Sequence, residues 1–316
     1  MRRACVAAAR GRCCAAVTDP APVPAPDRSP VAVTGARGFV AGRLLPRLAA
    51  TGRPLVAIVR PGRDATTLAA AGVEVREADL DAPEPHAAAF AGCGAVVHLS
   101  GMAQATRLVP VLEQAGVARG VFVSSAGVYT KLASASADKK RRGEDVLRAS
   151  RLAWTILRPS MIYGTPGDRN MARLLEWVRR FPVVVVPGDG STPQQPVHVD
   201  DLVSAIVAAL AQGHAGGRAY DVGGPDALPF RDVIRTCGAA MGRRPLVVPT
   251  PLGASHRAIV LFRRFGLLVP VRPEQVLRLA ESKAVDIGPA RRDLGFAPRS
   301  FEDGIRAEAA MLAGRG

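Results

Sequence analysis

The chain has 316 residues, of which 48% are hydrophobic, so it can bury one large core or two smaller ones. Its 42 Lys and Arg against 27 Asp and Glu give a formal charge of +15, which raises the question of a nucleic-acid partner. Almost all of this charge comes from arginine, which is enriched together with alanine, glycine and proline. We therefore interpret the charge as a compositional bias and expect no nucleic-acid partner.

Residues 1–30 are interpreted as an extension outside the fold. Prolines recur at every second position from Pro20 to Pro26, which predicts a disordered lead-in or a misassigned start codon. Arg10 and Arg12 interrupt the apolar stretch, so we expect no signal peptide or membrane span there. The five cysteines lack metal-ligand spacing and are odd in number, so we predict no metal site, no disulfide framework and a cytoplasmic location.

The first structured stretch has the pattern of a strand, a glycine-rich turn and a helix. Residues 31–34 are mostly β-branched, and leucines follow at helical spacing up to about residue 50. Gly35 permits a tight turn, and Gly38 lets the backbone approach a pyrophosphate. The first helical N–H groups, near Phe39 and Val40, can meet its charge. This context predicts a dinucleotide site.

A second strand is predicted over residues 55–59 and ends at Arg60. A site selective for NAD places an acid near this strand end to bind the ribose 2′-OH, whereas an arginine there suits the 2′-phosphate of NADP. No acid directly follows the strand, and Arg37 in the glycine-rich turn would lie near the same phosphate. The two arginines therefore favour NADP(H) over NAD(H).

A third short strand is predicted over residues 72–75 and leads to Asp79 and Leu80. At this place the carboxylate of Asp79 can meet the amino group of adenine. We therefore predict that both residues contribute to the cofactor site.

A fourth strand is predicted over residues 95–101. Its end, Leu99, Ser100 and Gly101, is predicted to contact the cofactor, because Gly101 lets the backbone pass close to it. His98 lies within the apolar part of the strand. We interpret it as a core residue with hydrogen-bonded ring nitrogens rather than as an acid–base group.

A helix over residues 103–115 and a fifth strand over residues 121–129 are predicted next. The strand carries the hydroxyls of Ser124 and Ser125, and open α/β sheets bind ligands at the carboxyl ends of their strands. We assign Ser124 to the cofactor site and Ser125 to the reacting end.

Seven stretches, in this order, resemble the extended and atypical short-chain dehydrogenase/reductase superfamily of the epimerase/dehydratase type. They are TGARGF (34–39), DL (79–80), VHL (97–99), SSAGVY (124–129), WTILRPSMIYG (154–164), QPVHVDD (195–201) and YDVGGP (220–225). Residues 290–298 look like the family's carboxyl-terminal pattern. The family's third glycine position holds Ala41, which is tolerated where the helix packs on the strand.

The resemblance implies an α/β fold, namely a Rossmann-type doubly wound parallel sheet with a smaller carboxyl-terminal substrate lobe. The NAD(P)-binding core is expected over residues 31–163, with Pro159 among its cofactor residues, and a mixed region over 164–316. Within the mixed region, the lobe is expected over about 164–195 and 226–285, and the return to the core over about 196–225.

Typical members of this family carry a Tyr-x-x-x-Lys pair, in which the tyrosine exchanges a proton with the substrate and the lysine binds the nicotinamide ribose. No such pair exists in this sequence. The family's lysine-to-glutamate spacing places Lys140 at the lysine and Ser136 at the tyrosine, and a serine hydroxyl is a poor substitute for a phenol. Ser125 matches the family's catalytic serine. We predict Ser125 and Lys140 as catalytic, with Lys140 also binding the ribose; the alternative is that both only hold the cofactor or the local structure.

In the second half of the chain, a helix is predicted over residues 171–180 and a strand over residues 181–186. His198 and Asp200 together invite a metal or acid–base hypothesis. We prefer to interpret Asp200 as the cap of a helix over residues 202–210.

The sequence therefore predicts an NAD(P)H-dependent oxidoreductase of the atypical short-chain type. It would act on a carbonyl or alcohol of a small molecule, such as a nucleotide sugar, as a monomer or homodimer. The alternative, suggested by the missing tyrosine, is a regulatory or scaffold protein that binds NADP(H) without turnover. Residues 251–280 are apolar but are interrupted by Arg263 and Arg264, so no membrane span is predicted.

Overall fold

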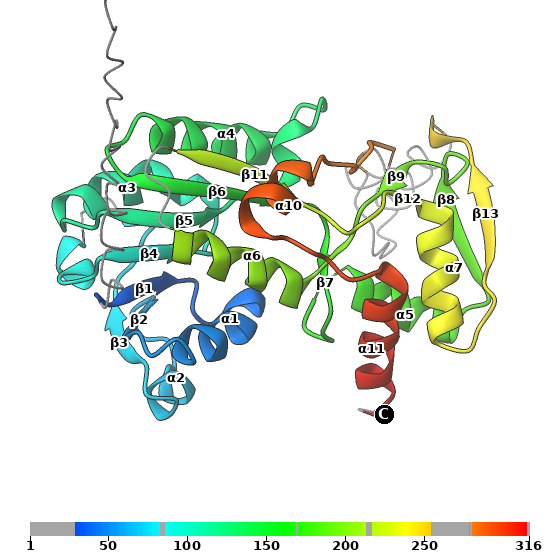
Figure 1. The fold of residues 1–316 in the computed structure, drawn as a ribbon. Coiled ribbons are helices and arrows are strands. Elements are labelled where there is room, and N and C mark those ends of the chain that lie inside the picture. The colour runs from blue at the N-terminus through cyan, green and yellow to red at the C-terminus, as the bar shows by residue number, and fades with distance from the viewer. Residues whose placement is uncertain are drawn as a thin grey trace, which may run out of the picture.

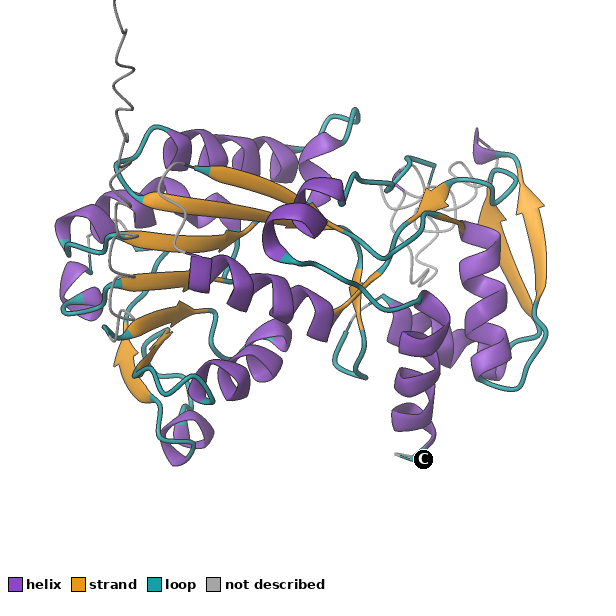
Figure 2. Ribbon diagram, viewed as in Figure 1, coloured by secondary structure: helices purple, strands orange, loops and turns teal. Residues whose placement is uncertain are grey.

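The computed structural model describes residues 29–82, 86–168, 170–212, 217–253, 278 and 280–314. Residues 1–28 of the predicted extension, and residues 254–277 of the apolar segment, lie outside the described residues. Figures 1 and 2 show a parallel sheet between helices in the first part of the chain. A smaller group of helices and short strands lies beside it.

Within the described residues, seven strands form one parallel sheet in the order β11-β6-β5-β4-β1-β2-β3. They are β1 (Val31–Thr34), β2 (Leu55–Val59), β3 (Glu74–Glu77), β4 (Ala95–His98), β5 (Arg119–Val123), β6 (Ala153–Pro159) and β11 (Arg218–Val222). The strand order reverses between β1 and β4. Open α/β sheets bind their ligands at such a point, outside the carboxyl ends of the strands.

Helices cover both faces of this sheet (Figure 1). One face packs against α1 (Phe39–Ala49), α6 (Val199–Gln212) and α10 (Gly288–Leu294), and the other against α3 (Ala105–Gln114) and α4 (Ala135–Arg148). Successive strand side chains point to opposite faces, so Val31 and Val33 join the first core and Ala32 joins the second. This arrangement confirms the predicted doubly wound fold.

Among the described residues, three further helices pack around a third hydrophobic core, which includes Leu175, Val233 and Ile305. They are α5 (Met171–Arg180), α7 (Phe230–Ala240) and α11 (Phe301–Ala313). Three strand pairs accompany them, namely β7 (Ile162–Tyr163) with β10 (Val197–His198), β9 (Pro193–Gln194) with β12 (Leu228–Pro229), and β8 (Val183–Pro187) with β13 (Leu246–Thr250). The role of this group as a substrate lobe stays a prediction.

Short elements explain where the predicted boundaries were wrong. The third strand lies at Glu74–Glu77 rather than at residues 72–75, because α2 (Thr66–Ala70) ends in a turn in which Gly72 has φ +74°. The fifth strand ends at Val123 rather than at residue 129. After it, the Ser125 hydroxyl accepts a hydrogen bond from Gly127 N–H and opens the 3-10 turn η3 (Ala126–Tyr129).

The start of α6 also corrects a prediction, because the helix begins at Val199 and Asp200 is not its cap. The Asp200 carboxylate instead accepts hydrogen bonds of 2.7 and 2.8 Å from Arg43 of α1. The capping atom is Nδ1 of His198, which accepts the Asp200 N–H at 3.2 Å. The neighbouring Asp201 binds Arg299, so α6 is fastened both to α1 and to the segment before α11.

Candidate cofactor and reaction site

A pocket of about 300 Å³ opens at the carboxyl ends of β1, β2, β3 and β4, where the strand order reverses. Eight residues predicted for the cofactor line it, namely Gly35, Arg37, Gly38, Arg60, Asp79, Leu80, Leu99 and Ser100. Six lining residues were not predicted, namely Ala36, Ile58, Val59, Arg63, Ala78 and Gln104. The pocket is thus assembled from four loops that are distant in sequence.

The turn after β1 fits a dinucleotide phosphate. Gly35 has φ +67°, and a Cβ built there would lie 2.9 Å from the backbone nitrogen of Ser100. A larger residue would therefore both strain the turn and push the loop after β4 outwards. Gly38 precedes α1 in extended conformation, with no side chain capping the helix and no acid in its first turn. The first N–H groups of α1 are thus left for an anion.

His98 holds the loop after β4 in place. Its Nε2 lies 2.9 Å from the carbonyl oxygen of Gly101, and its Nδ1 lies 2.8 Å from Oγ1 of Thr34. Because a carbonyl only accepts, Nε2 carries the proton and Nδ1 accepts from the threonine. Burial lowers the pKa of His98 to about 4, so the ring is neutral. The prediction that His98 is a hydrogen-bonded core residue is confirmed.

The arginines at the pocket differ in how far their charge is compensated. Arg60 contacts Asp81 at 3.0 Å and Asp79 at 3.5 Å. No acid directly follows β2 in the sequence, but these two acids come from the end of the neighbouring strand β3. Arg37 and Arg63 form no ion pair within the described ranges. They therefore remain as the available cations of the pocket.

Ser125 and Lys140, the predicted catalytic residues, both lie close to Gly127. A Cβ built on Gly127 would lie 3.2 Å from Ser125 Oγ and 3.8 Å from Lys140 Nζ. Lys140 has no hydrogen-bond or ion-pair partner in the part of the chain that the structure describes. Burial, and then the charge of Arg278, lower the pKa of Lys140.

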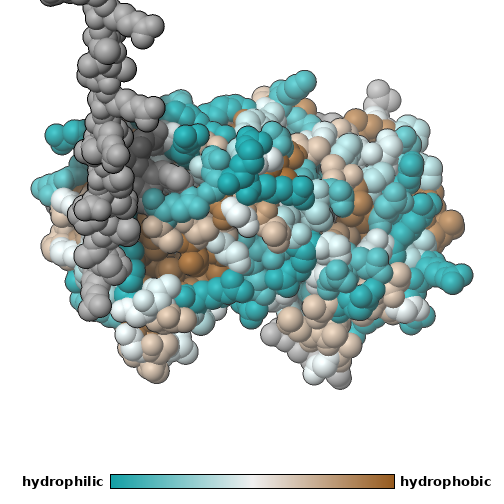
Figure 3. All heavy atoms as spheres, in the orientation of Figure 1, coloured by the Kyte–Doolittle hydropathy of each residue, from teal (hydrophilic) through white to brown (hydrophobic). Residues whose placement is uncertain are grey.

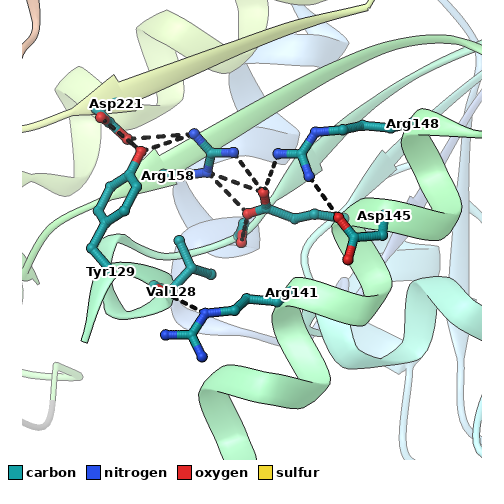
Figure 4. A network of polar contacts seen from close by, with 9 residues as sticks. Val128, Tyr129, Arg141, Asp145, Arg148, Arg158 and Asp221 are labelled. Atoms are coloured by element: carbon teal, nitrogen blue, oxygen red, sulfur yellow. Dashed lines mark hydrogen bonds and ion pairs between the residues drawn. The ribbon is translucent and has the colours of Figure 1, made fainter. Parts of the chain in front are cut away.

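A polar network next to Ser125 and Lys140 in the sequence, built on Ser124 and Glu144, fixes α4 to the sheet (Figure 4). Glu144 of α4 accepts hydrogen bonds from Ser124 at 2.7 Å and from Arg158 of β6 at 2.6 and 3.0 Å. The phenol of Tyr129 donates to Asp221 of β11 at 2.8 Å and accepts from Arg158 at 2.9 Å. Burial and the Asp221 carboxylate raise the pKa of Tyr129. The phenol therefore already has a donor and an acceptor within the protein.

The other predicted residues lie outside the pocket. Phe39 and Val40 form the first turn of α1, and Pro159 ends β6. Gly101 is held by His98, and Ser136, which stands at the family's tyrosine position, is exposed on α4. Arg63 could have been predicted from the sequence, because it follows Arg60 by three residues in the loop after β2, and a turn joins the two. Gln104 carried no comparable signal.

The NAD(P)H-binding family matches residues 35–212 of the sequence. The chain belongs to this family. It lies within the epimerase/dehydratase-like short-chain dehydrogenase/reductase superfamily, as the resemblance implied. The pocket therefore belongs to a fold that binds a pyridine nucleotide.

Two curated relatives are reductases. The 2-alkyl-3-oxoalkanoate reductase of Stenotrophomonas maltophilia is 29% identical, with 87% of this chain and 97% of that protein covered. The ceramide reductase of Caulobacter vibrioides is 29% identical, with 71% of this chain and 74% of that protein covered. Among solved structures, MoeE5 in complex with UDP-glucuronic acid and NAD shares the fold, with a TM-score of 0.69 at 22% identity, and 90% and 99% of the two chains are covered.

The described residues lack both a membrane-spanning helix and a metal-binding cluster. None of the described helices combines the length and the apolar composition that a bilayer crossing requires. Over the same residues, no three His, Cys, Asp or Glu side chains are grouped so that they could hold a metal ion.

Proposed function

We propose that the protein is an NADPH-dependent reductase that converts a ketone of a small molecule into an alcohol. A bound nicotinamide would supply the hydride. Ser125 would hydrogen-bond the substrate oxygen, and Lys140 would deliver the proton that this oxygen needs once it becomes an alkoxide. The observation that carries the proposal is the half-buried Lys140 amine beside Ser125, without a partner in the described chain.

The surroundings of Lys140 suit a proton donor. An ammonium whose pKa is lowered towards neutrality is a stronger acid than a lysine in water, and it transfers its proton more readily to an alkoxide. Burial and the cation of Arg278 act in this direction. The Ser125 oxygen accepts the Gly127 N–H at 3.1 Å, which leaves its own proton for a substrate oxygen.

The proposed substrate class is a 3-oxo acid or a related long-chain ketone. Support comes from the two relatives, which are named for 2-alkyl-3-oxoalkanoates and for ceramide and match most of this chain. A nucleotide sugar is the weaker choice, because MoeE5 is only 22% identical and shares the fold alone.

The proposed cofactor is NADP(H) in preference to NAD(H). Arg37 and Arg63 line the pocket without an ion pair among the described residues, and they suit a 2′-phosphate. Arg60 contributes less than the sequence indicated, because Asp79 and Asp81 share its charge. A cytoplasmic location is also proposed, from the odd number and irregular spacing of the cysteines in the sequence.

The reaction is tested by following NADPH consumption with a panel of 3-oxo acids, other ketones and nucleotide sugars. We expect turnover with the 3-oxo acids, a loss of about 100-fold or more in kcat for Lys140→Ala, and a smaller loss for Ser125→Ala. Lys139→Ala, one residue away on the exposed side of α4, is the matched control and should keep its activity. Full activity of Lys140→Ala would refute its role.

The cofactor preference is tested separately by titration. Arg37→Ala should weaken NADPH binding by about tenfold and leave NADH binding almost unchanged, because only NADPH carries the 2′-phosphate. Equal affinity of the wild type for both cofactors would contradict the proposal. Arg60→Glu should have the smaller effect on NADPH, since this arginine already contacts two carboxylates.

A second candidate is a protein that binds NADP(H) without turnover. It is favoured by one observation: Ser136 at the family's tyrosine position is exposed, and the nearby Tyr129 phenol is already hydrogen-bonded to Asp221 and Arg158. This candidate predicts micromolar or tighter NADPH binding with no consumption across the substrate panel. Turnover that Lys140→Ala abolishes would exclude it.

A further inference from the structure

The outer face of the β8–β13 sheet and the adjoining end of α5 expose large apolar side chains. Val185 and Leu246 are 60% and 63% exposed, and Trp177 and Phe181 are 42% and 46% exposed. We call these four residues, together with Val183, the apolar patch. Met311 and Tyr129 are the other large apolar side chains exposed in the described ranges, and both lie on other elements.

The residues of the patch are neighbours in the fold. The rings of Trp177 and Phe181 are in contact, with centroids 4.5 Å apart and planes tilted by 40°, and Trp177 Nε1 donates to the carbonyl oxygen of Val183 at 3.1 Å. Val183 is paired with Leu246 in the sheet register, and Val185 shares its face because strand side chains alternate. The intervening valines point into the third core. Figure 3 shows hydrophobic spheres at the edge of the molecule where β13 lies.

Arginines border the patch on two adjacent turns. Arg179 and Arg180 end α5, and Arg243 and Arg244 precede β13. A hydrogen bond of 2.7 Å from Leu246 N–H to the carbonyl oxygen of Pro182 joins the two turns. All four arginines are exposed, and none has an ion-pair partner in the described part of the chain. Glu176, three residues before Arg179, is the acid nearest to these arginines in the sequence, and it adds one negative charge against their four positive charges.

We infer that this face docks on a membrane surface rich in anionic lipid. Trp and Phe side chains suit the boundary between headgroups and acyl chains, and a basic rim adds attraction to anionic headgroups. Charge complementarity favours this occupant over a second copy of the chain. A two-fold contact through the patch would bring four arginines against the same four arginines.

Docking would orient the whole molecule on the bilayer. The patch lies at the end of the smaller group of elements, whereas the pocket opens on β1 to β4 at the other side of the molecule (Figure 1). The cofactor pocket would therefore remain open to water while the lobe touches lipid. This inference does not depend on the proposed reaction, because it uses none of the residues assigned to it.

The test is co-sedimentation of the full-length protein with vesicles of phosphatidylcholine alone or with a third of phosphatidylglycerol. We expect at least tenfold tighter binding to the anionic vesicles, and weakening by high salt. Val185→Glu with Leu246→Glu should weaken this binding by about tenfold or more, and so should Arg243→Glu with Arg244→Glu. Met311→Glu, which places the same charge at an exposed apolar site on α11, is the matched control.

Unchanged NADPH affinity and melting temperature would show that each variant is folded, and the arginine pair changes no apolar contact of the lobe. Equal binding to neutral and anionic vesicles, or full binding by both double variants, would overturn the inference. A wild-type dimer that Val185→Glu with Leu246→Glu converts to a monomer, without a change in vesicle binding, would assign the face to a second copy instead.

Discussion

Two buried glutamates, one in the core and one in the smaller lobe, ionise in opposite ways. Glu144 of α4 is 2% exposed and Glu308 of α11 is fully buried. Burial raises the pKa of both carboxyls, but the hydrogen bonds and charge of Arg158 lower the pKa of Glu144 below its usual value. Glu308 faces Asp168 instead, and burial together with this second acid raises its pKa to about 9. The neighbours of the two carboxyls, rather than their depth, therefore decide their charge.

The two glutamates, each with its polar neighbours, also hold different elements together. Glu144 lies one helical turn after Lys140, so its ion pairs fix the part of α4 that presents the proposed proton donor. Glu308 accepts the Gly164 N–H at 2.9 Å, and Asp168 accepts the Met171 N–H at 2.8 Å, so the acid pair joins α11 to the start of α5. The core thus holds a charged clamp of Glu144 with Arg158, whereas the lobe holds a carboxyl, Glu308, whose raised pKa keeps it protonated at neutral pH.

The largest expected effect comes from removing the clamp's cation. Arg158→Leu would leave Glu144 buried with Arg148 as its remaining ion pair and would remove the donor to Tyr129. We expect a loss of about 3–5 kcal/mol in the free energy of unfolding, measured with urea. A loss below about 1 kcal/mol would show that Glu144 becomes neutral at little cost. Glu144 and Glu308 would then no longer differ in how strongly their neighbours fix their charge.

The next effect concerns the acid pair and depends on pH. An unfolded Glu ionises near 4.3, whereas Glu308 in the folded chain ionises at about 9, so the folded state holds the extra proton between these values. The stability from Glu308 is thus fully present below about pH 4.3 and is lost as pH rises through about 9. Glu308→Gln, which is neutral at every pH, should flatten the decline between pH 6 and 9. We expect a stabilisation on the order of 1–3 kcal/mol at pH 8.

Glu302→Gln is the matched control for that measurement, because Glu302 lies on the same helix but is exposed and paired with Arg306. It should retain the decline of the wild type. If the stability of Glu308→Gln in urea unfolding declines with pH as steeply as that of the wild type, Glu308 does not hold an extra proton in the folded state.

A smaller effect is expected for Tyr129→Phe, which keeps the ring and removes the hydroxyl between Asp221 and Arg158. We expect about 1 kcal/mol lower stability, because one hydrogen-bonded hydroxyl is lost while the two charged partners remain 4.0 Å apart. Turnover should stay within about threefold of the wild type, since Lys140 is the proposed proton donor. A hundredfold loss of kcat with unchanged NADPH affinity would transfer that role to Tyr129.

The smallest effect is expected for Arg148→Ala. This arginine also binds Glu144, at 2.7 Å, but its side chain is 40% exposed, against 12% for Arg158. We expect a loss of at most about 1 kcal/mol by urea unfolding, because water screens the pair. A loss equal to that of Arg158→Leu would mean that both arginines share the clamp evenly.

Local rules predicted much of the fold. The turn at Gly35, the strand Leu55–Val59 and the helix Met171–Arg180 lie where the sequence placed them, since spacing and turn chemistry act over a few residues. The topology of the sheet was predicted from the seven stretches that follow the order of the resembled family. The errors at residues 72–75 and 121–129 arose where a glycine turn or a serine side chain ended the regular structure.

The site was harder to predict where partners come from distant segments. Asp168 and Glu308 are 140 positions apart in the sequence, and no spacing pattern connects them. The acids beside Arg60 could have been found, because β2 and β3 are neighbours and the loops after parallel strands meet at one edge of the sheet. The exposed face of β8 and β13 could not be predicted from the sequence, because a run of valines is also typical of a strand that is buried on both faces.

The two ion pairs at the start of α6 have a consequence for synthesis on the ribosome. Asp201 is almost fully buried and is satisfied by Arg299, which follows it by 98 positions, and Ala290 and Leu294 cover the core beside α6. A nascent chain that has emerged only as far as α7 contains every residue that lines the pocket, but Asp201 lacks its partner Arg299. The residues that line the pocket are therefore made before the segments that close the core beside α6.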